Sequence, residues 1–95
     1  MKYKVVYLDS SLFDLADIKQ YLDQHSEMAW FNLIDKMETQ IGNLSKFPYI
    51  GVIYKKYRRL VCDGYLVFYK VDKKREVVEI IRILHSKRDI KSLIK

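Results

Sequence analysis

The feature that most constrains the fold of this chain is a pair of segments that are apolar on both faces. Residues 65–71 read YLVFYKV, and residues 76–84 read EVVEIIRIL. A strand with one face in water would alternate apolar and polar residues, and neither segment does so throughout. Both are therefore predicted to be strands in the interior of a sheet or beneath helices. The link between them, residues 72–75, is fully charged and predicts a tight connection.

Apolar residues at helical spacing predict two helices in succession. They recur at three- and four-residue steps through residues 12–22 and again through residues 30–44, and Pro48 prevents the second helix from continuing. Ser11 and Asp14 are expected to form a capping pair at the start of the first helix. Two helices joined by so few residues are expected to form an antiparallel hairpin.

The complete pattern predicts an α+β fold with the order β-α-α-β-β-β. Residues 2–9 are typical of a first strand and residues 54–62 (YKKYRRLVC) of a second, and Asp63-Gly64 predicts a hairpin turn into the next strand. Residues 88–95 (RDIKSLIK) predict a short C-terminal helix. We expect a helical hairpin packed on one face of an antiparallel sheet, with residues 1–95 forming a single domain.

Charge is distributed unevenly along the chain. Residues 1–47 hold five Lys and Arg against seven Asp and Glu, a balance of −2, whereas residues 48–95 hold thirteen against five, a balance of +8. A polarised chain of this kind indicates an anionic partner that faces the C-terminal half: nucleic acid, the ribosome or an acidic protein. The alternative is that these charges serve only solubility.

Cysteine and histidine usage excludes several classes of protein. The single cysteine, Cys62, rules out an intramolecular disulfide and is typical of the reducing cytoplasm. No segment approaches the ~20 apolar residues of a membrane span, and we expect no secretory leader. The histidines and the cysteine lack the spacing of a zinc site, and no glycine-rich phosphate loop is present. We therefore expect a cytoplasmic protein with no metal, no cofactor and no membrane partner.

Arginines within the predicted strands are the first candidate functional residues. Arg58 and Arg59 are adjacent, so their side chains must point to opposite faces of the sheet. Arg82 lies within an apolar strand, where an unpaired charge is costly to bury. It could lie in a shallow groove on the helix-free face, beside Arg58 or Arg59. The alternative for Arg82 is an ion pair across the sheet with one of three acidic residues: Asp63, Glu76 or Glu79.

A cationic cluster follows directly after the last strand: His85, Lys87 and Arg88. A histidine can transfer protons near neutral pH, and adjacent cations can bind a phosphate. Cleavage of RNA by its own 2′-hydroxyl needs these parts, namely a base, an acid and cations at the phosphorane. The alternative is that His85 is hydrogen-bonded to the backbone and that Asp89 caps the last helix.

The order of elements and two segments resemble the RelE/ParE superfamily of bacterial toxins from type II toxin–antitoxin modules. The segments are YRRLVCDGYLVFYKVD, residues 57–72, and IRILHSKRD, residues 81–89, whose end resembles the RVLHGRRD ending of ParE-like members. The resemblance spans essentially the whole chain. It implies a RelE/ParE-like fold and a small basic toxin that forms a hetero-oligomer with a cognate antitoxin, which neutralises it.

The superfamily divides by activity, and the resemblance implies that Leu66 bears on the division. RelE-type members cleave mRNA on the ribosome, whereas ParE-type members poison DNA gyrase and are not nucleases. The RelE-like nucleases resemble GYRLVY in the third strand, with an arginine that contacts the scissile phosphate. This chain reads GYLVFY, so Leu66 takes the place of that arginine. The resemblance therefore favours a ParE-like toxin that acts on DNA gyrase or another protein target.

Each reading gives roles to the same residues. In the ParE-like reading, the residues that contact the target or the antitoxin are Arg58, Arg59, Arg82, His85, Lys87 and Arg88. In the alternative reading, a RelE-like ribosome-dependent mRNA endonuclease, His85 transfers protons while Arg59, Arg82 and Arg88 stabilise the transition state. A second alternative is a degenerate toxin that only binds its antitoxin and helps to repress their operon.

Overall fold

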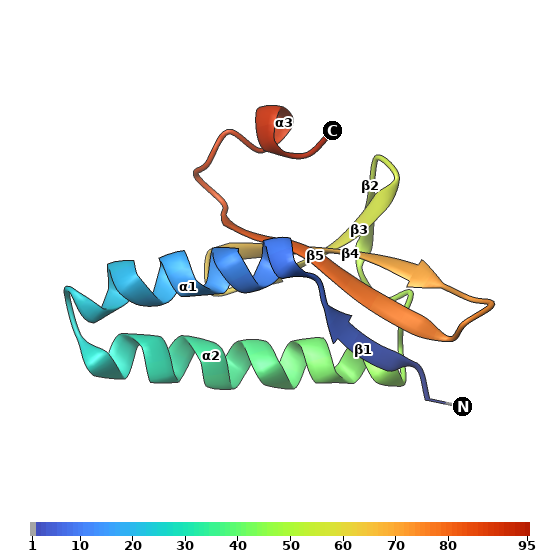
Figure 1. Cartoon of the computed structure of the whole chain (residues 1–95), viewed down its shortest axis with the longest axis horizontal. Helices are drawn as coiled ribbons and strands as arrows, with labels where there is room; N and C mark the ends of the chain where they lie inside the picture. The colour runs from blue at the N-terminus through green and yellow to red at the C-terminus, as the bar shows by residue number, and fades with distance from the viewer. Residues whose placement is uncertain (1) are drawn as a thin grey trace.

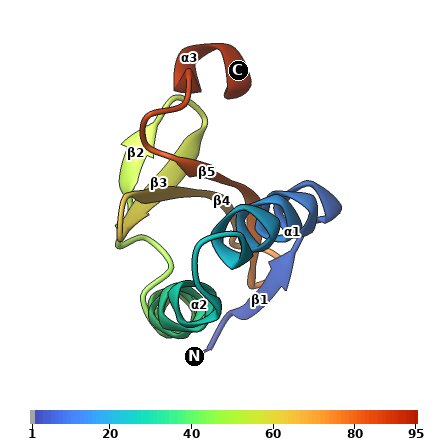
Figure 2. The same ribbon diagram turned by 90° about the vertical axis from the view of Figure 1, so that its left-hand side faces the viewer.

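The computed structural model describes residues 2–95, so Met1 of the expected domain 1–95 lies outside the described residues. The chain forms an α+β fold, with two long helices on one face of a sheet and a short C-terminal helix, as predicted (Figures 1 and 2). None of the helices in residues 2–95 is long and apolar enough to cross a membrane. The elements in chain order are β1 (Lys4–Tyr7), α1 (Asp9–Asp23), α2 (Glu27–Gly42), the 3₁₀ turn η1 (Asn43–Ser45), β2 (Val52–Tyr54), β3 (Tyr57–Cys62), β4 (Tyr65–Asp72), β5 (Val77–His85) and α3 (Ile90–Leu93).

The sheet has the strand order β1-β5-β4-β3-β2. As predicted, the two segments that are apolar on both faces, β4 and β5, lie inside the sheet. The pairings β5–β4, β4–β3 and β3–β2 are antiparallel, but β1 pairs with β5 in parallel, so the sheet is mixed rather than antiparallel throughout. A parallel pair needs a crossover connection, which here runs through the helical hairpin and the other strands.

The segment 54–62, predicted as one strand, is divided between β2 and β3. A turn at Lys55 and Lys56 separates the two strands, and Lys55 has a φ of 56°. The predicted strand did not include Val52 and Ile53, which are 64% and 66% exposed at the edge of the sheet. An exposed edge strand has no buried face to create an alternation of apolar and polar residues.

A β-bulge in β5 changes which side chains face the helices. Phe68 of β4 pairs with Arg82, but the next residue, Tyr69, pairs with Ile80, so Ile81 is the extra residue. Before the bulge, Ile80 packs into the core beneath α1 and α2. After it, Arg82 and Leu84 have the other parity and face the side of the sheet that carries α3.

Side chains of α1 take the place of a strand along the outer edge of β5. β1 ends at Tyr7, opposite Ile80, and leaves the next backbone groups of β5 without a strand neighbour. There the Ser10 hydroxyl donates to the Ile81 carbonyl oxygen at 2.6 Å, and Asp14 Oδ2 accepts the Ile83 N–H at 2.9 Å. Unpaired backbone groups would be costly at this buried edge, so these bonds fix the position of α1.

Asp14 also binds Arg82, which corrects two of our predictions. Arg82 Nε and Nη2 donate to the two Asp14 carboxylate oxygens at 2.8 and 3.0 Å. The partner of Arg82 is therefore a residue of α1 and none of the three acidic residues expected. Asp14 and Ser11 do not form a capping pair, because α1 begins at Asp9 and the Ser11 hydroxyl donates to the Leu8 carbonyl oxygen.

Replacing Asp14 with alanine should lower the free energy of unfolding by about 2–4 kcal/mol, because the Ile83 N–H and the Arg82 guanidinium would both lose their acceptor. Urea unfolding followed by circular dichroism measures this loss. Asp17→Ala is the matched control, because Asp17 is exposed on the same helix, and its expected effect is below about 0.5 kcal/mol. Equal losses in the two variants would contradict the role assigned to Asp14.

Candidate functional site

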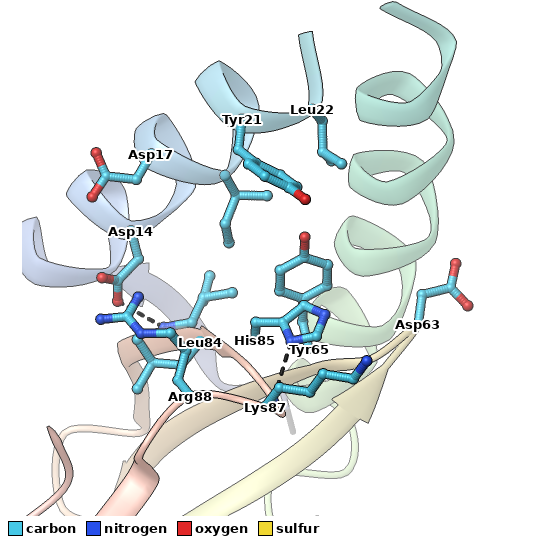
Figure 3. Close-up of a pocket in the computed structure, with 12 residues that line it drawn as sticks. Asp14, Asp17, Tyr21, Leu22, Asp63, Tyr65, Leu84, His85, Lys87 and Arg88 are labelled. Atoms are coloured by element: carbon cyan, nitrogen blue, oxygen red, sulfur yellow. Dashed lines mark hydrogen bonds between the residues drawn. The ribbon is translucent and has the colours of Figure 1, made fainter. Parts of the chain in front are cut away.

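A pocket of about 650 Å³ lies between α1 and the end of β5 (Figure 3). Its walls come from α1, the β3–β4 turn and the residues around the end of β5. Its lining combines an apolar floor with tyrosines, three carboxylates and three of the predicted site residues: Asp14, Asp17, Ile18, Tyr21, Leu22, Asp63, Tyr65, Ile83, Leu84, His85, Lys87 and Arg88. We call it the His85 pocket.

The bulge in β5 places His85 in this pocket. In an unbulged strand, His85 would face away from Ile80 and the helices; the extra residue Ile81 reverses that parity. The end of the strand is then fixed by the hairpin turn, because His85 pairs with Tyr65 and the Ser86 N–H donates to the Gly64 carbonyl oxygen at 2.8 Å.

The hydrogen bond to His85 defines how its imidazole can act. Nδ1 accepts the Lys87 backbone N–H at 3.1 Å, and the ring packs edge-on against Tyr65 with 5.1 Å between centroids. A neutral imidazole with an acceptor at Nδ1 carries its proton on Nε2. His85 can therefore offer an N–H donor to a ligand, and its backbone bond agrees with the structural alternative considered for it.

Two tyrosines that sequence reasoning did not select belong to the same pocket. Figure 3 shows the hydroxyls of Tyr21 and Tyr65 pointing toward one another. Burial raises the pKa of Tyr65 above its usual value, and the neighbouring Tyr21 raises it further. Tyr65 therefore stays a neutral phenol that can donate a hydrogen bond. No pattern in the sequence connects these residues, because one lies on α1 and the other on β4.

The charges around the pocket have both signs. Lys87 and Arg88 are exposed at its edge. Of the lining carboxylates, Asp14 is bound by Arg82, and Asp63 is bound by Lys36 at 2.9 Å. The Asp63 carboxylate raises the pKa of Lys36 through this hydrogen bond. Two of the three carboxylates are thus already neutralised, and the accessible cations remain free for an anionic group.

The other predicted arginines do not converge on His85. As predicted, Arg58 and Arg59 point to opposite faces: Arg58 pairs with Tyr69 of the helix-side core, and Arg59 with Phe68 of the other face. Arg58 Nη1 donates to the carbonyl oxygens of Tyr49 and Gly51 at 3.1 and 2.9 Å.

Arg59 and Arg82 occupy the same row of the sheet, on either side of Phe68. The Arg59 guanidinium lies 5.7 Å from the centroid of the Tyr54 ring. Arg82, by contrast, turns to Asp14, and this hydrogen bond raises the pKa of Arg82. Arg82 is therefore a structural cation, and only Arg59 of this pair lacks a carboxylate partner within residues 2–95.

A comparison with known protein families identifies the family of this chain. The sequence pattern described as "ParE toxin of type II toxin-antitoxin system, parDE" matches residues 5–90. The chain belongs to the ParE toxin family. No curated protein sequence is significantly similar to it.

Solved structures share the fold of this ParE-family chain at low sequence identity. A chain of the chromosomal ParDE toxin–antitoxin system from P. aeruginosa superposes with a TM-score of 0.73 at 14% identity, over 90% of this chain and 98% of that one. The isolated E. coli RelE toxin gives 0.63 at 13%, over 96% and 93%. A chain of the RelBE2 complex from Mycobacterium tuberculosis gives 0.61 at 19%, over 90% and 99%.

In this ParE-family chain, the C-terminal segment around α3 covers Leu66, the position at which the resemblance led us to expect an arginine in a nuclease. Leu66 is 7% exposed and packs with Leu84 and with Ile94, which is 3% exposed. A hydrogen bond from Lys55 Nζ to the Ile94 carbonyl oxygen, at 2.9 Å, fixes the C-terminal segment after α3 against the sheet. A guanidinium at position 66 would have to enter this apolar cluster.

The neutral imidazole of His85 should carry its proton on Nε2. The reason is the Lys87 N–H, which occupies Nδ1. Long-range ¹H–¹⁵N correlation of the imidazole nitrogens measures the tautomer. The exposed His25 serves as the internal reference. A His85 ring protonated mainly on Nδ1 would contradict the geometry.

Proposed function

We propose that this chain is the toxin of a type II toxin–antitoxin module, is neutralised by a cognate antitoxin, and acts by binding a protein target, DNA gyrase first among the candidates. The observation that carries the proposal is the separation of the groups that RNA cleavage would need. His85 lies on the hairpin side of the sheet, and Arg59 lies on the side that carries α3.

RNA cleavage would need the catalytic groups to converge on one phosphate, and in this structure they are separated. A proton-transfer group and the cations that stabilise the phosphorane must be within hydrogen-bond reach of one phosphate. Here the sheet stands between His85 and Arg59, Asp14 holds Arg82, and Leu66 is apolar and covered. A protein-binding toxin needs no such convergence, because it depends on an extended contact surface.

A cognate antitoxin fits the distribution of charge. The C-terminal half carries the balance of +8, and it supplies His85, Lys87 and Arg88 at the pocket. Two of the structural neighbours are toxin–antitoxin complexes, RelBE2 and E. coli RelBE. An acidic antitoxin segment at this surface would gain from the accessible cations and would block the target at the same place.

The nuclease reading retains one observation in its favour. His85, Lys87 and Arg88 line the same pocket, so a proton-transfer group and two cations do share one site there. In this second candidate function, His85 would have to lose the bond from the Lys87 N–H to its Nδ1 and become an imidazolium, which could then donate a proton from Nε2 as the acid, while Arg88 would bind the phosphate. Arg59 and Arg82 would have no part in it.

Purified toxin should inhibit DNA supercoiling by gyrase and leave mRNA intact in a translating extract. His85→Ala should retain inhibition within about threefold, since no bond is made or broken at the histidine. The double variant Lys87→Glu/Arg88→Glu should lose at least about tenfold, because two contact charges are reversed. Gel assays of supercoiling and primer-extension mapping of the mRNA measure the two activities.

The matched control for the double variant is Lys73→Glu/Lys74→Glu, which makes the same change of charge in the exposed β4–β5 turn. Ribosome-dependent cuts in the mRNA that vanish in His85→Ala would overturn the proposal and establish the nuclease. A toxin that affects neither gyrase nor mRNA, yet binds its antitoxin, would be the degenerate form.

A further inference from the structure

A second cationic hollow lies at the far end of the sheet from the His85 pocket. It has a volume of about 310 Å³ and shares no lining residue with that pocket. Four cations and two exposed or half-buried tyrosines define what we call the β2–β3 turn cluster: Lys55, Lys56, Arg58, Lys70, Tyr49 and Tyr57. Within the described residues 2–95, no carboxylate lines this hollow. In Figure 1 the β2–β3 hairpin projects away from α1 and α2.

Two of the lysines are gathered around one aromatic ring. Lys56 Nζ lies 5.5 Å and Lys70 Nζ 5.2 Å from the centroid of Tyr57. Neither takes part in an ion pair found in residues 2–95, although Glu79 stands opposite Lys70 in the register of β4 and β5. The ammonium groups of Lys56 and Lys70, beside the same ring, repel each other, and a bound anion would reduce that repulsion.

The cations of the cluster that have no hydrogen-bond partner within residues 2–95 indicate which class of anion it would bind. The Arg58 guanidinium already donates to the Tyr49 and Gly51 carbonyl oxygens, and Lys55 is tied to Ile94. The cations left free are lysines, which act as point charges on phosphate, whereas two-pronged recognition of a carboxylate is the property of arginine. These groups therefore suit a row of phosphates better than an acidic peptide.

The surroundings of the two tyrosines indicate whether the cluster would bind a single strand or a duplex. Proteins that bind single strands stack the bases on free aromatic faces. Here Tyr57 is already faced by Lys56 and Lys70, and Tyr49 by Arg58 at 5.1 Å. Because cations already lie over both rings, the cluster favours contact with the backbone of a duplex over stacking of unpaired bases.

We propose that the β2–β3 turn cluster binds the phosphate backbone of duplex DNA without sequence preference. The inference goes beyond the proposed function, because it holds whether or not gyrase is the target. It would also extend that function, since a toxin directed at a DNA-bound enzyme would contact the protein through one surface and the DNA through another.

Fluorescence anisotropy of a labelled short duplex of mixed sequence tests the proposal, with a single strand of the same length beside it. Wild-type toxin should prefer the duplex, with a slope of log K against log salt of roughly −2 to −3 between about 50 and 200 mM. Lys56→Gln/Lys70→Gln should weaken binding at least about tenfold and reduce the slope by roughly 2. Lys56→Gln alone, at an exposed position, should give about half of the logarithmic loss.

The matched control is Lys2→Gln/Lys4→Gln, because both lysines are exposed at the β1 edge, across the sheet from β2. It should change the affinity less than threefold, and circular dichroism should show all variants folded. Equal losses in the two double variants would overturn the proposal, since binding would then follow net charge alone. Tighter binding of the single strand would also overturn it. So would an acidic peptide that binds more tightly than the duplex and depends on Lys56 and Lys70. Supercoiling assays test the gyrase proposal separately, so either idea can fail alone.

Discussion

The edge of β5 beyond Tyr7 is the constraint on which the rest of this structure depends. β1 is too short to pair with the whole of β5, and the buried backbone groups that remain need partners. Ser10 and Asp14 supply them, and the same carboxylate neutralises Arg82. A helix held at these points has a fixed rotation and a fixed height on the sheet. Its next turns, which carry Tyr21, therefore lie over the end of β5 and complete the His85 pocket.

The bulge at Ile81 is the second constraint on the fold. It places His85 and Leu84 on opposite faces of the sheet from those they would have in a regular strand. With the extra residue, His85 faces the helical hairpin, while Leu84 and the row of Arg59 face α3. One surface is then a pocket with a histidine and exposed cations, and the other is an apolar cluster closed by the C-terminal segment. This division supports the proposal of a protein-binding toxin over that of a nuclease.

The excess positive charge of the C-terminal half is likewise divided in space. At the His85 pocket the cations share the site with carboxylates, two of which are bound by Arg82 and Lys36. At the β2–β3 turn cluster, in the part of the chain that the structure describes, the lining cations have no carboxylate among them. A mixed surface suits a shaped protein partner, whereas a surface of one sign suits a polyanion. The two proposals rest on this difference.

The sequence by itself determined the class of each main element, the interior position of β4 and β5, the helical hairpin and the family. These follow from hydrophobic periodicity and from short motifs such as IRILHSKRD, which are local properties of the chain. Only the tertiary structure decided the parallel pairing of β1, the exposed strand β2, the bulge, the partner of Arg82 and the meeting of Tyr21 with Tyr65. Each of these depends on contacts between distant segments or on one backbone conformation. Neither can be read from hydrophobic periodicity, because the period shows that a face is buried and not which distant segment buries it.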